Sequence, residues 1–522
     1  MRCFFAGALI FGIVATLRAA FPFAEATIDD LQRRMASGEL TARAVTAAYL
    51  ERIAEVDRNG PKLNAVIEVN PDALAIAEQL DAERRAGKVR GPLHGIPILI
   101  KDNIATADQM ETTAGSLALV GAKPPRDAHL VVRLREAGAV ILGKTNLSEW
   151  ANFRGSSSTS GWSGRGGQTR NPYALDRNPS GSSSGSAATV SANLCVAAIG
   201  TETNGSIVSP SSVCGIVGVK PTVGLISRAG IIPIAATLDT AGPMTRTVRD
   251  AAIVLQVLAG RDERDAATGE APPDLNSGYA TTLKRDALRG ARIGVLRGPF
   301  NFRPWLDPVL AKTIANLREA GAEIVDLGEP AILRQISNHS YEVMLFEFKT
   351  GLNAYLAELP PTTRIKTMAD VIAFNKAHAK EELRIFGQEV MVQSEAKGPL
   401  TDSAYLEARE KALRLSRAEG IDAMMDKHQL DALLALTTGP AALGDSIYGG
   451  ATTNTGGSST LAAVAGYPSV TLPAAEVKGL PLGVSFFGRA WSEAKLLSLA
   501  ADFEARTQVR REPKLLPTMG SR

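Results

Sequence analysis

The sequence predicts an α/β fold, because strand patterns alternate with helix patterns in two separate parts of a long, apolar chain. The chain has 522 residues, of which 45% are hydrophobic, so it can bury a sizeable core. The first alternation consists of strand 95–100, helix 129–138 and strand 139–144, and the second of strand 291–296, helix 307–321 and strand 322–327. Each succession is the β-helix-β arrangement from which α/β sheets are built.

Helix patterns flank these alternations on both sides. Before the first, we expect helices over 28–37, 42–56 and 72–87, with Asn59-Gly60-Pro61 as a break. After the second, the section from about 332 to 427 is helical and is the most individual part of the chain. Together with the Gly/Ser/Thr-rich segment 444–460, it is expected to shape a substrate funnel.

The first 26 residues have the pattern of a cleavable signal peptide. Arg2 precedes the apolar run from Cys3 to Leu17, and Ala24-Glu25-Ala26 has the A-x-A form of a signal-peptidase site. The run is shorter than the ~20 apolar residues of a transmembrane helix, although an uncleaved anchor is the alternative. We therefore expect a periplasmic or secreted protein whose mature domain is 27–522, with no stable membrane association after cleavage.

The charge of the chain gives no electrostatic case for a nucleic-acid partner. The formal net charge is only +3, and charged residues make up 21% of the sequence. Basic residues gather only in short pairs, which we interpret as solvated helix or tail charges: Arg33-Arg34, Arg84-Arg85 and Arg510-Arg511. The sequence does not indicate an oligomeric state.

The segment 179–221 has the features of an active site. Two glycine-rich serine loops, PSGSSSGSA and GTETNGS, lie on either side of an apolar segment, ANLCVAAIG, which we expect to be helical. Glycine permits tight turns and close approaches, and a serine at such a turn can hold its hydroxyl outward. A flexible Gly/Ser linker is the alternative, but a linker would not be interrupted by an apolar segment or followed by GIVGVKP.

Upstream, the apolar run GIPILI ends in Lys101 and reads as a buried strand with a lysine at its tip. Burial penalises the charged ammonium and lowers the pKa of a lysine, which makes a general base available near neutral pH. On its own this signal is weak, because most lysines at strand ends reach out to solvent.

Together these elements resemble the amidase signature family of serine hydrolases. Lys101 falls at the family lysine of the KDN motif, Ser182 at the cis-serine of the first loop, and Ser206 at the nucleophile of the second. The interval between the two serines matches the family spacing. Similar motifs recur along essentially the whole mature chain, at 143–146, 220–222, 239–244 and 465–468. Within the family, SEWANFRG and GWSGRGGQTRNPY look most like bacterial peptide amidases, which remove the C-terminal amide of peptides.

The resemblance implies a single large amidase-signature domain, with a mixed central β-sheet covered by helices on both faces and a signature core at about 90–260. It implies that Ser206 attacks the amide carbonyl, that Ser182, after a cis peptide bond, relays the proton, and that neutral Lys101 is the base. Backbone N–H groups of the turn Thr203-Asn204-Gly205 would stabilise the oxyanion. The substrate would be a peptide or small-molecule amide, and no cofactor is expected.

Departures from the family pattern are modest. Ser180 and Ser184 stand where many members carry Gly, Asn204 where Asp or Gly is usual, and Leu436 interrupts a frequent Ala-Pro-Thr. Alternative functions are an amidase acting on aryl, aliphatic or fatty-acyl amides, and a glutamine amidotransferase subunit, which export disfavours. An inactive binding protein on the same fold is disfavoured by the intact Lys101, Ser182 and Ser206.

Other site chemistries have less support. The histidines lack the spacing of a zinc site, so no metal is expected: His94, His129, His339, His378 and His428. No G-x-S-x-G elbow surrounds Ser206, and nothing argues for a Ser-His-Asp triad, although folding could bring its members together. We expect Cys195 and Cys214 to be buried thiols, with a disulfide as the alternative.

Overall fold

A mixed sheet of 11 strands forms the centre of the computed structural model, which describes residues 21–272, 278–298, 303–444 and 457–520. In spatial order the strands are β1 (Val66–Val69), β3 (Val140–Thr145), β2 (Pro97–Lys101), β6 (Ala197–Glu202), β8 (Thr240–Thr245), β7 (Val217–Lys220), β12 (Ser469–Val477), β13 (Leu480–Phe487), β11 (Ala432–Leu436), β9 (Arg292–Leu296) and β10 (Glu323–Gly328). A separate hairpin pairs β4 (Trp162–Ser163) with β5 (Gly167–Gln168). The mixed sheet confirms the predicted fold class.

The middle of this sheet positions the site. Strand β2 lies between β3 and β6 and runs parallel to both, and every residue of the three strands is buried. Their carboxyl ends therefore meet at one edge of the sheet. Strand β8 runs antiparallel to β6, so that Thr240 at its start pairs with Glu202 at the end of β6. Residues from four segments thus converge beside Lys101.

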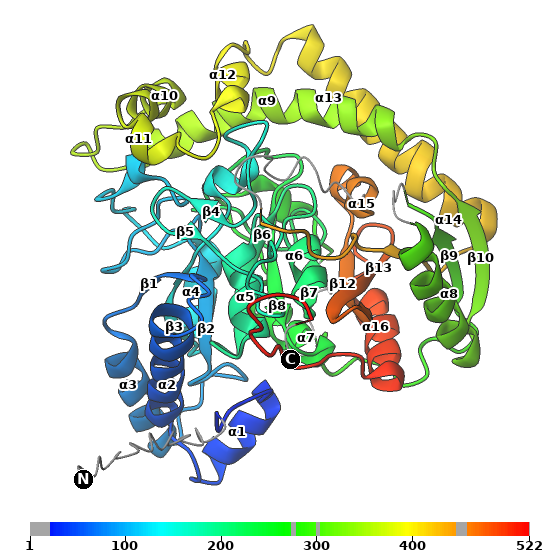
Figure 1. The fold of residues 1–522 in the computed structure, drawn as a ribbon, viewed down its shortest axis with the longest axis horizontal. Coiled ribbons are helices and arrows are strands. Elements are labelled where there is room, and N and C mark those ends of the chain that lie inside the picture. Colours follow the sequence, from blue (N-terminus) through cyan, green and yellow to red (C-terminus); the bar gives the residue numbers. More distant parts are fainter. Residues whose placement is uncertain (1–20, 273–277, 299–302, 445–456, 521–522) are drawn as a thin grey trace, which may run out of the picture.

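Helices cover both faces of the sheet (Figure 1). They are α1 (Ile28–Ala36), α2 (Ala42–Arg52), α3 (Ala73–Arg85), α4 (His129–Glu136), α5 (Ser184–Ser191), α6 (Val208–Val213), α7 (Val248–Leu258), α8 (Arg303–Glu319), α15 (Ser459–Ala465) and α16 (Glu493–Thr507). Helices α5 and α6 pack on each other and on the sheet, whereas α4, α7, α16 and α8 contact one another in succession. None of the helices in the described ranges is long and apolar enough to cross a membrane.

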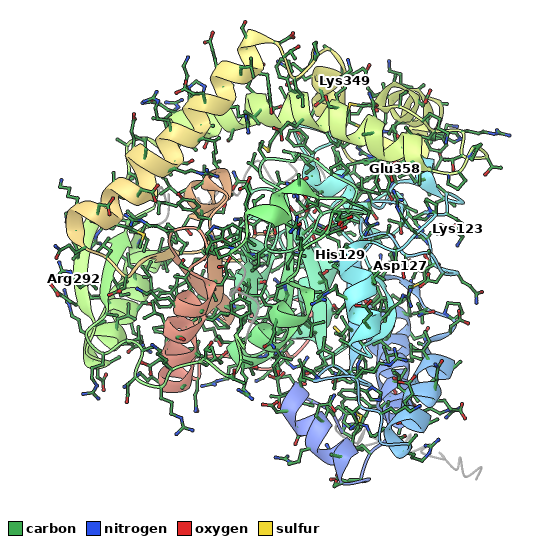
Figure 2. The ribbon with its side chains drawn as sticks, turned by 180° about the vertical axis from the view of Figure 1, so that it is seen from behind. Lys123, Asp127, His129, Arg292, Lys349 and Glu358 are labelled. Carbon is green, nitrogen blue, oxygen red and sulfur yellow. The ribbon has the colours of Figure 1, made fainter. Side chains whose placement is uncertain are left out.

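A helical section arches over one end of the molecule (Figure 1). It comprises α9 (Leu333–Glu358), α10 (Met368–Ala377), α11 (Ala379–Glu382), α12 (Glu389–Glu395), α13 (Ser403–Ser416) and α14 (Asp422–His428). Glu358, at the end of α9, pairs with Arg126 at 2.7 Å, and Figure 2 shows it on the same side of the molecule as Lys123 and Asp127.

A buried ion cluster also holds this section on the sheet. The guanidinium of Arg154 contacts the carboxylates of Glu149 and of Glu382 on α11, and all three side chains are fully buried. It also donates to the Phe386 carbonyl at 2.9 Å, and its charge lies over the Phe386 ring. Because an unpaired buried charge is costly, the cluster fixes α11 against the loop that carries Glu149.

Most predicted elements are found, with one error inside the signature segment. Helix α5 ends at Ser191, and the apolar segment Ala192–Gly200, predicted to be helical, is a turn leading into strand β6. A short apolar run that is buried on all sides cannot be assigned to helix or strand from its periodicity. Cys195 and Cys214 are both buried and unbonded, as expected.

The expected signal sequence is described only in part. The apolar run Cys3–Leu17 lies outside the described residues, while Phe21 to Ala26 pack on the folded domain. The ring of Phe23 is 5% exposed and stacks on Tyr49, and the Ala26 carbonyl accepts a hydrogen bond from Arg246 at 2.7 Å. Cleavage after Ala26 would remove these contacts, and the cleavage position stays a prediction.

A chain that begins at Phe21 should be more stable than one that begins at Thr27. Burying a phenylalanine side chain contributes about 1.5–3 kcal/mol, so losing Phe23 should lower the urea midpoint measurably. Phe23→Ala in the longer chain is the matched control and should account for most of the difference. Equal midpoints for the two chains would show that the segment contributes nothing to stability.

Candidate active site

The amine of Lys101 lies at the centre of the predicted site. Strand β2 delivers it into the sheet edge, where its side chain is fully buried. Its Nζ lies 2.8 Å from Ser182 Oγ, 2.9 Å from Thr201 Oγ1 and 3.3 Å from the Thr201 carbonyl oxygen. An ammonium has three N–H donors, so these three oxygens satisfy the charged form completely.

The same geometry suits the neutral amine. The Thr201 carbonyl can only accept, and Thr201 Oγ1 also accepts from Asn103 Nδ2 at 3.0 Å. A neutral amine that keeps both of its N–H bonds to Thr201 therefore directs its lone pair at the Ser182 hydroxyl. Lys101 is thereby placed to accept a proton from Ser182.

The surroundings make the neutral amine accessible. Burial lowers the pKa of Lys101 to about 7, while the carboxylates of Asp239 and Glu202 act in the opposite direction. Two further lysines, Lys144 and Lys220, are also fully buried, and burial lowers the pKa of each to about 8. Lys144 Nζ donates to the Ile104 carbonyl and to Thr112 Oγ1, and Lys220 Nζ donates to backbone carbonyls; neither bonds to a serine within the described ranges. Sequence reasoning did not identify these two as buried.

Ser182 and Ser206 lie in adjacent loops. The peptide bond between Gly181 and Ser182 is cis. The N–H of Ser183 donates to the Ser206 carbonyl at 3.1 Å, which joins the two loops directly. Within the described residues the two hydroxyls form no hydrogen bond with each other, and apo sites often tighten such contacts only with substrate bound. Ser206 is 8% exposed and Ser182 is 0% exposed, so Ser206 is the more accessible of the two.

The turn that contains Ser206 is held by a buried carboxylate. Glu202 Oε1 accepts from the N–H of Gly205 at 2.9 Å, and Oε2 accepts from those of Ile207 at 2.8 Å and Val208 at 3.1 Å. Gly205 has φ 87°, a conformation that favours glycine. Of the predicted oxyanion donors, the Gly205 N–H is thus already occupied by Glu202.

The other turn residues are tied down by their side chains. Thr203 Oγ1 donates to Asp239 at 2.6 Å, and Asn204 Oδ1 accepts from Ser459 Oγ at 2.8 Å. The backbone N–H groups of Asn204 and Ser206 have no partner within the described part of the chain, so these two groups remain available to an oxyanion.

A cavity of about 210 Å³ opens beside this turn. Its apolar lining includes residues 231–234, and its polar and charged lining is formed by Asn103, Thr201, Thr203, Arg228, Asp239, Thr240, Arg264 and Asp265. The cavity therefore reaches Thr201, which contacts Lys101. No cluster of three or more potential metal ligands occurs within the described ranges.

Sequence reasoning missed three of the residues that shape the site. Asn103, Glu202 and Asp239 each fall inside a quoted motif, KDN, TETNGS or DTAGPM, but only the fold shows what they contact. The signal available in the sequence was a polar side chain next to a catalytic position at a strand end.

Comparison with known proteins identifies the family of this chain. A family model described as Amidase matches residues 44–497. The native peptide amidase from Stenotrophomonas maltophilia is 52% identical, with a TM-score of 0.91, over 95% of this chain and 100% of that one. The peptide amidase PAM in complex with the competitive inhibitor chymostatin is 53% identical, with a TM-score of 0.91, over 94% and 100%. An Arabidopsis thaliana protein named "Probable amidase" is 41% identical over 509 residues, 96% of this chain and 93% of that protein.

The pH dependence of Ser206 reactivity should report the deprotonation of Lys101. Because the base must be neutral and its pKa is about 7, the rate of modification by a fluorophosphonate should rise through about pH 7 and then level off. At pH 5.5 only about 3% of the plateau rate should remain, because only about that fraction of a group with a pKa of about 7 is deprotonated at this pH. A rate that climbs without a plateau until above about pH 10 would indicate a solvated lysine.

Proposed function

This chain belongs to the amidase family, and on that premise we propose that it hydrolyses the C-terminal amides of peptides to the free acid and ammonia, using Ser206, Ser182 and Lys101. One observation carries the proposal: a fully buried lysine whose Nζ lies 2.8 Å from a serine hydroxyl. A surface lysine would be protonated at neutral pH, whereas this amine can lose its proton.

The proposed reaction has two halves. Ser206 attacks the amide carbonyl while its proton passes to Ser182, whose own proton passes to the lone pair of Lys101. The oxyanion is stabilised by the N–H groups of Asn204 and Ser206. The proton then returns through Ser182 to the leaving nitrogen, ammonia departs and an acyl-enzyme remains. Water, activated by the same pair, releases the acid and restores Ser206.

Peptide substrates are supported by likeness to the two peptide amidase structures, one of which carries chymostatin as a competitive inhibitor. Both match nearly all of this chain at about half identity, so the parts that surround the site are included in the likeness. Aryl, aliphatic and fatty-acyl amides are the alternative substrates, and an inactive binding protein is the alternative of another class.

We also propose that the protein is exported. The support is the sequence pattern alone: Arg2, the apolar run Cys3–Leu17 and the A-x-A motif ending at Ala26. Export is consistent with a hydrolase that acts on peptides outside the cytoplasm. Fractionation of the producing cells, with N-terminal sequencing of the mature chain, tests it.

Removing either end of the proton relay should abolish turnover. Ser206→Ala and Lys101→Met should each lower kcat by about 10⁴ or more, and the double mutant should be little worse, because the groups act as a unit. Circular dichroism checks that both variants fold. Near-normal turnover in Ser206→Ala would end the assignment of the nucleophile.

The substrate is tested with one peptide prepared as its amide and as its free acid. The amide should gain about one dalton as NH₂ becomes OH, and the acid should be unchanged, as mass spectrometry can show. Internal bonds should survive, since a pocket fitted to ammonia leaves no space for a continuing chain. Internal cleavage, or ammonia release from aryl or fatty amides only, would reject the peptide assignment.

A further inference from the structure

A carboxylate that has no step in the proposed reaction faces the buried base. Asp239 Oδ1 accepts from Thr203 Oγ1 at 2.6 Å, and Oδ2 accepts from the N–H groups of Ile234 at 2.8 Å and Ala235 at 2.9 Å. Three donors thus fix one side chain, which lies at the wall of the 210 Å³ cavity. Three protein donors to one carboxylate stabilise its charged form and hold it in one position.

We propose that Asp239 is a positioning residue that stabilises the protonated form of Lys101, and so sets the pH at which this lysine becomes available as a base. The inference rests on the proposed role of Lys101. It assigns to Asp239 no contact with the substrate and no proton transfer.

The geometry connects the two charges through one short stretch of chain. Thr201 accepts from Lys101 Nζ, and Thr203, two residues later, donates to Asp239. Both threonines line the same cavity, so their side chains lie on the same side of the chain. The ammonium and the carboxylate each bond to a threonine hydroxyl on the wall of this cavity, and a carboxylate near a buried ammonium stabilises its charge.

The neighbouring charges Glu202 and Arg228 are held by other hydrogen bonds. Lys101 also faces Glu202, whose two oxygens accept from the backbone of the turn that contains Ser206. Asp239 faces Arg228, whose guanidinium is bound by Asp265 at 2.8 Å. Glu202 cannot turn toward the amine, and Arg228 cannot turn toward Asp239, without breaking these bonds.

Asp239 can keep its charge at neutral pH. Burial raises the pKa of Asp239 to about 6, while the donors from Thr203, Ile234 and Ala235 and the charge of Arg228 act to lower it. It is therefore mostly ionised at pH 7. Full burial alone can lower the pKa of a lysine by up to 3–5 units, which would leave a weak base, and a nearby carboxylate offsets part of that effect.

The test compares two aspartates whose pKa is raised by burial to about 6. Asp250 on α7 is buried and accepts from the Ile28 N–H at 3.1 Å, but it lies outside the site. For Asp239→Asn we expect the acid limb of kcat/KM, and of fluorophosphonate labelling at Ser206, to move down by about one pH unit. For Asp250→Asn we expect no movement.

A milder variant keeps the proposal testable if Asp239→Asn does not fold. Thr203→Val removes one donor to the carboxylate, which then takes up a proton at higher pH, so the acid limb should move in the same direction by a smaller amount. An unmoved or raised limb in the folded variants, or an equal shift in Asp250→Asn, would overturn the role of Asp239. Activity retained in Lys101→Met would instead refute the proposed base, whatever the Asp239 variants do.

Discussion

The burial of one amine is the constraint on which the site depends. Lys101 ends a strand that is flanked by parallel strands on both sides, so its amine has no access to water and every partner must come from the protein. An ammonium buried without partners would be costly. Three oxygens from Ser182 and Thr201 remove that cost, and they come from elements about 80 and 100 residues away. The fold of β6 and of the Ser182 loop is therefore tied to the chemistry of a single side chain.

Carboxylates bind the backbone of the loops around this amine. Glu202 accepts from three N–H groups on either side of Ser206, and Asp239 accepts from two in the loop at 234–235. Such charge-assisted hydrogen bonds are about twice as strong as those between neutral groups. Donors aimed at a developing oxyanion act most strongly when they need no reorganisation, so a turn fixed in this way is preorganised for its role.

The sequence predicted strands β2, β3, β9 and β10 and helices α1–α4 and α8, because these elements leave local patterns. It assigned Lys101, Ser182 and Ser206 to the site through motifs with strong spacing, and their catalytic roles stay predictions. It failed where the structure of a segment, or the burial of a side chain, depends on residues distant in the chain. The segment Ala192–Gly200 is a buried strand entry that periodicity could not distinguish from a helix. Nothing in the sequence predicts that Lys144 and Lys220 are fully buried, as they are in the fold. Asp239 reads as a turn residue, and only its contact with Thr203 reveals its electrostatic position.

The helical section connects to Ser182 through one loop. The N–H of Ser148 donates to the Ser182 carbonyl at 3.1 Å, and the next residue, Glu149, belongs to the buried cluster with Arg154 and Glu382 of α11. Burial raises the pKa of Glu149 well above its usual range, and the Glu382 carboxylate adds to the effect, while Arg154 opposes it. Two buried carboxylates share one guanidinium, so a shift of α11 would leave a buried charge unpaired. Such a shift would also displace Glu149 and, with it, the neighbouring Ser148. The buried cluster thus links the helical section to the loop that holds Ser182.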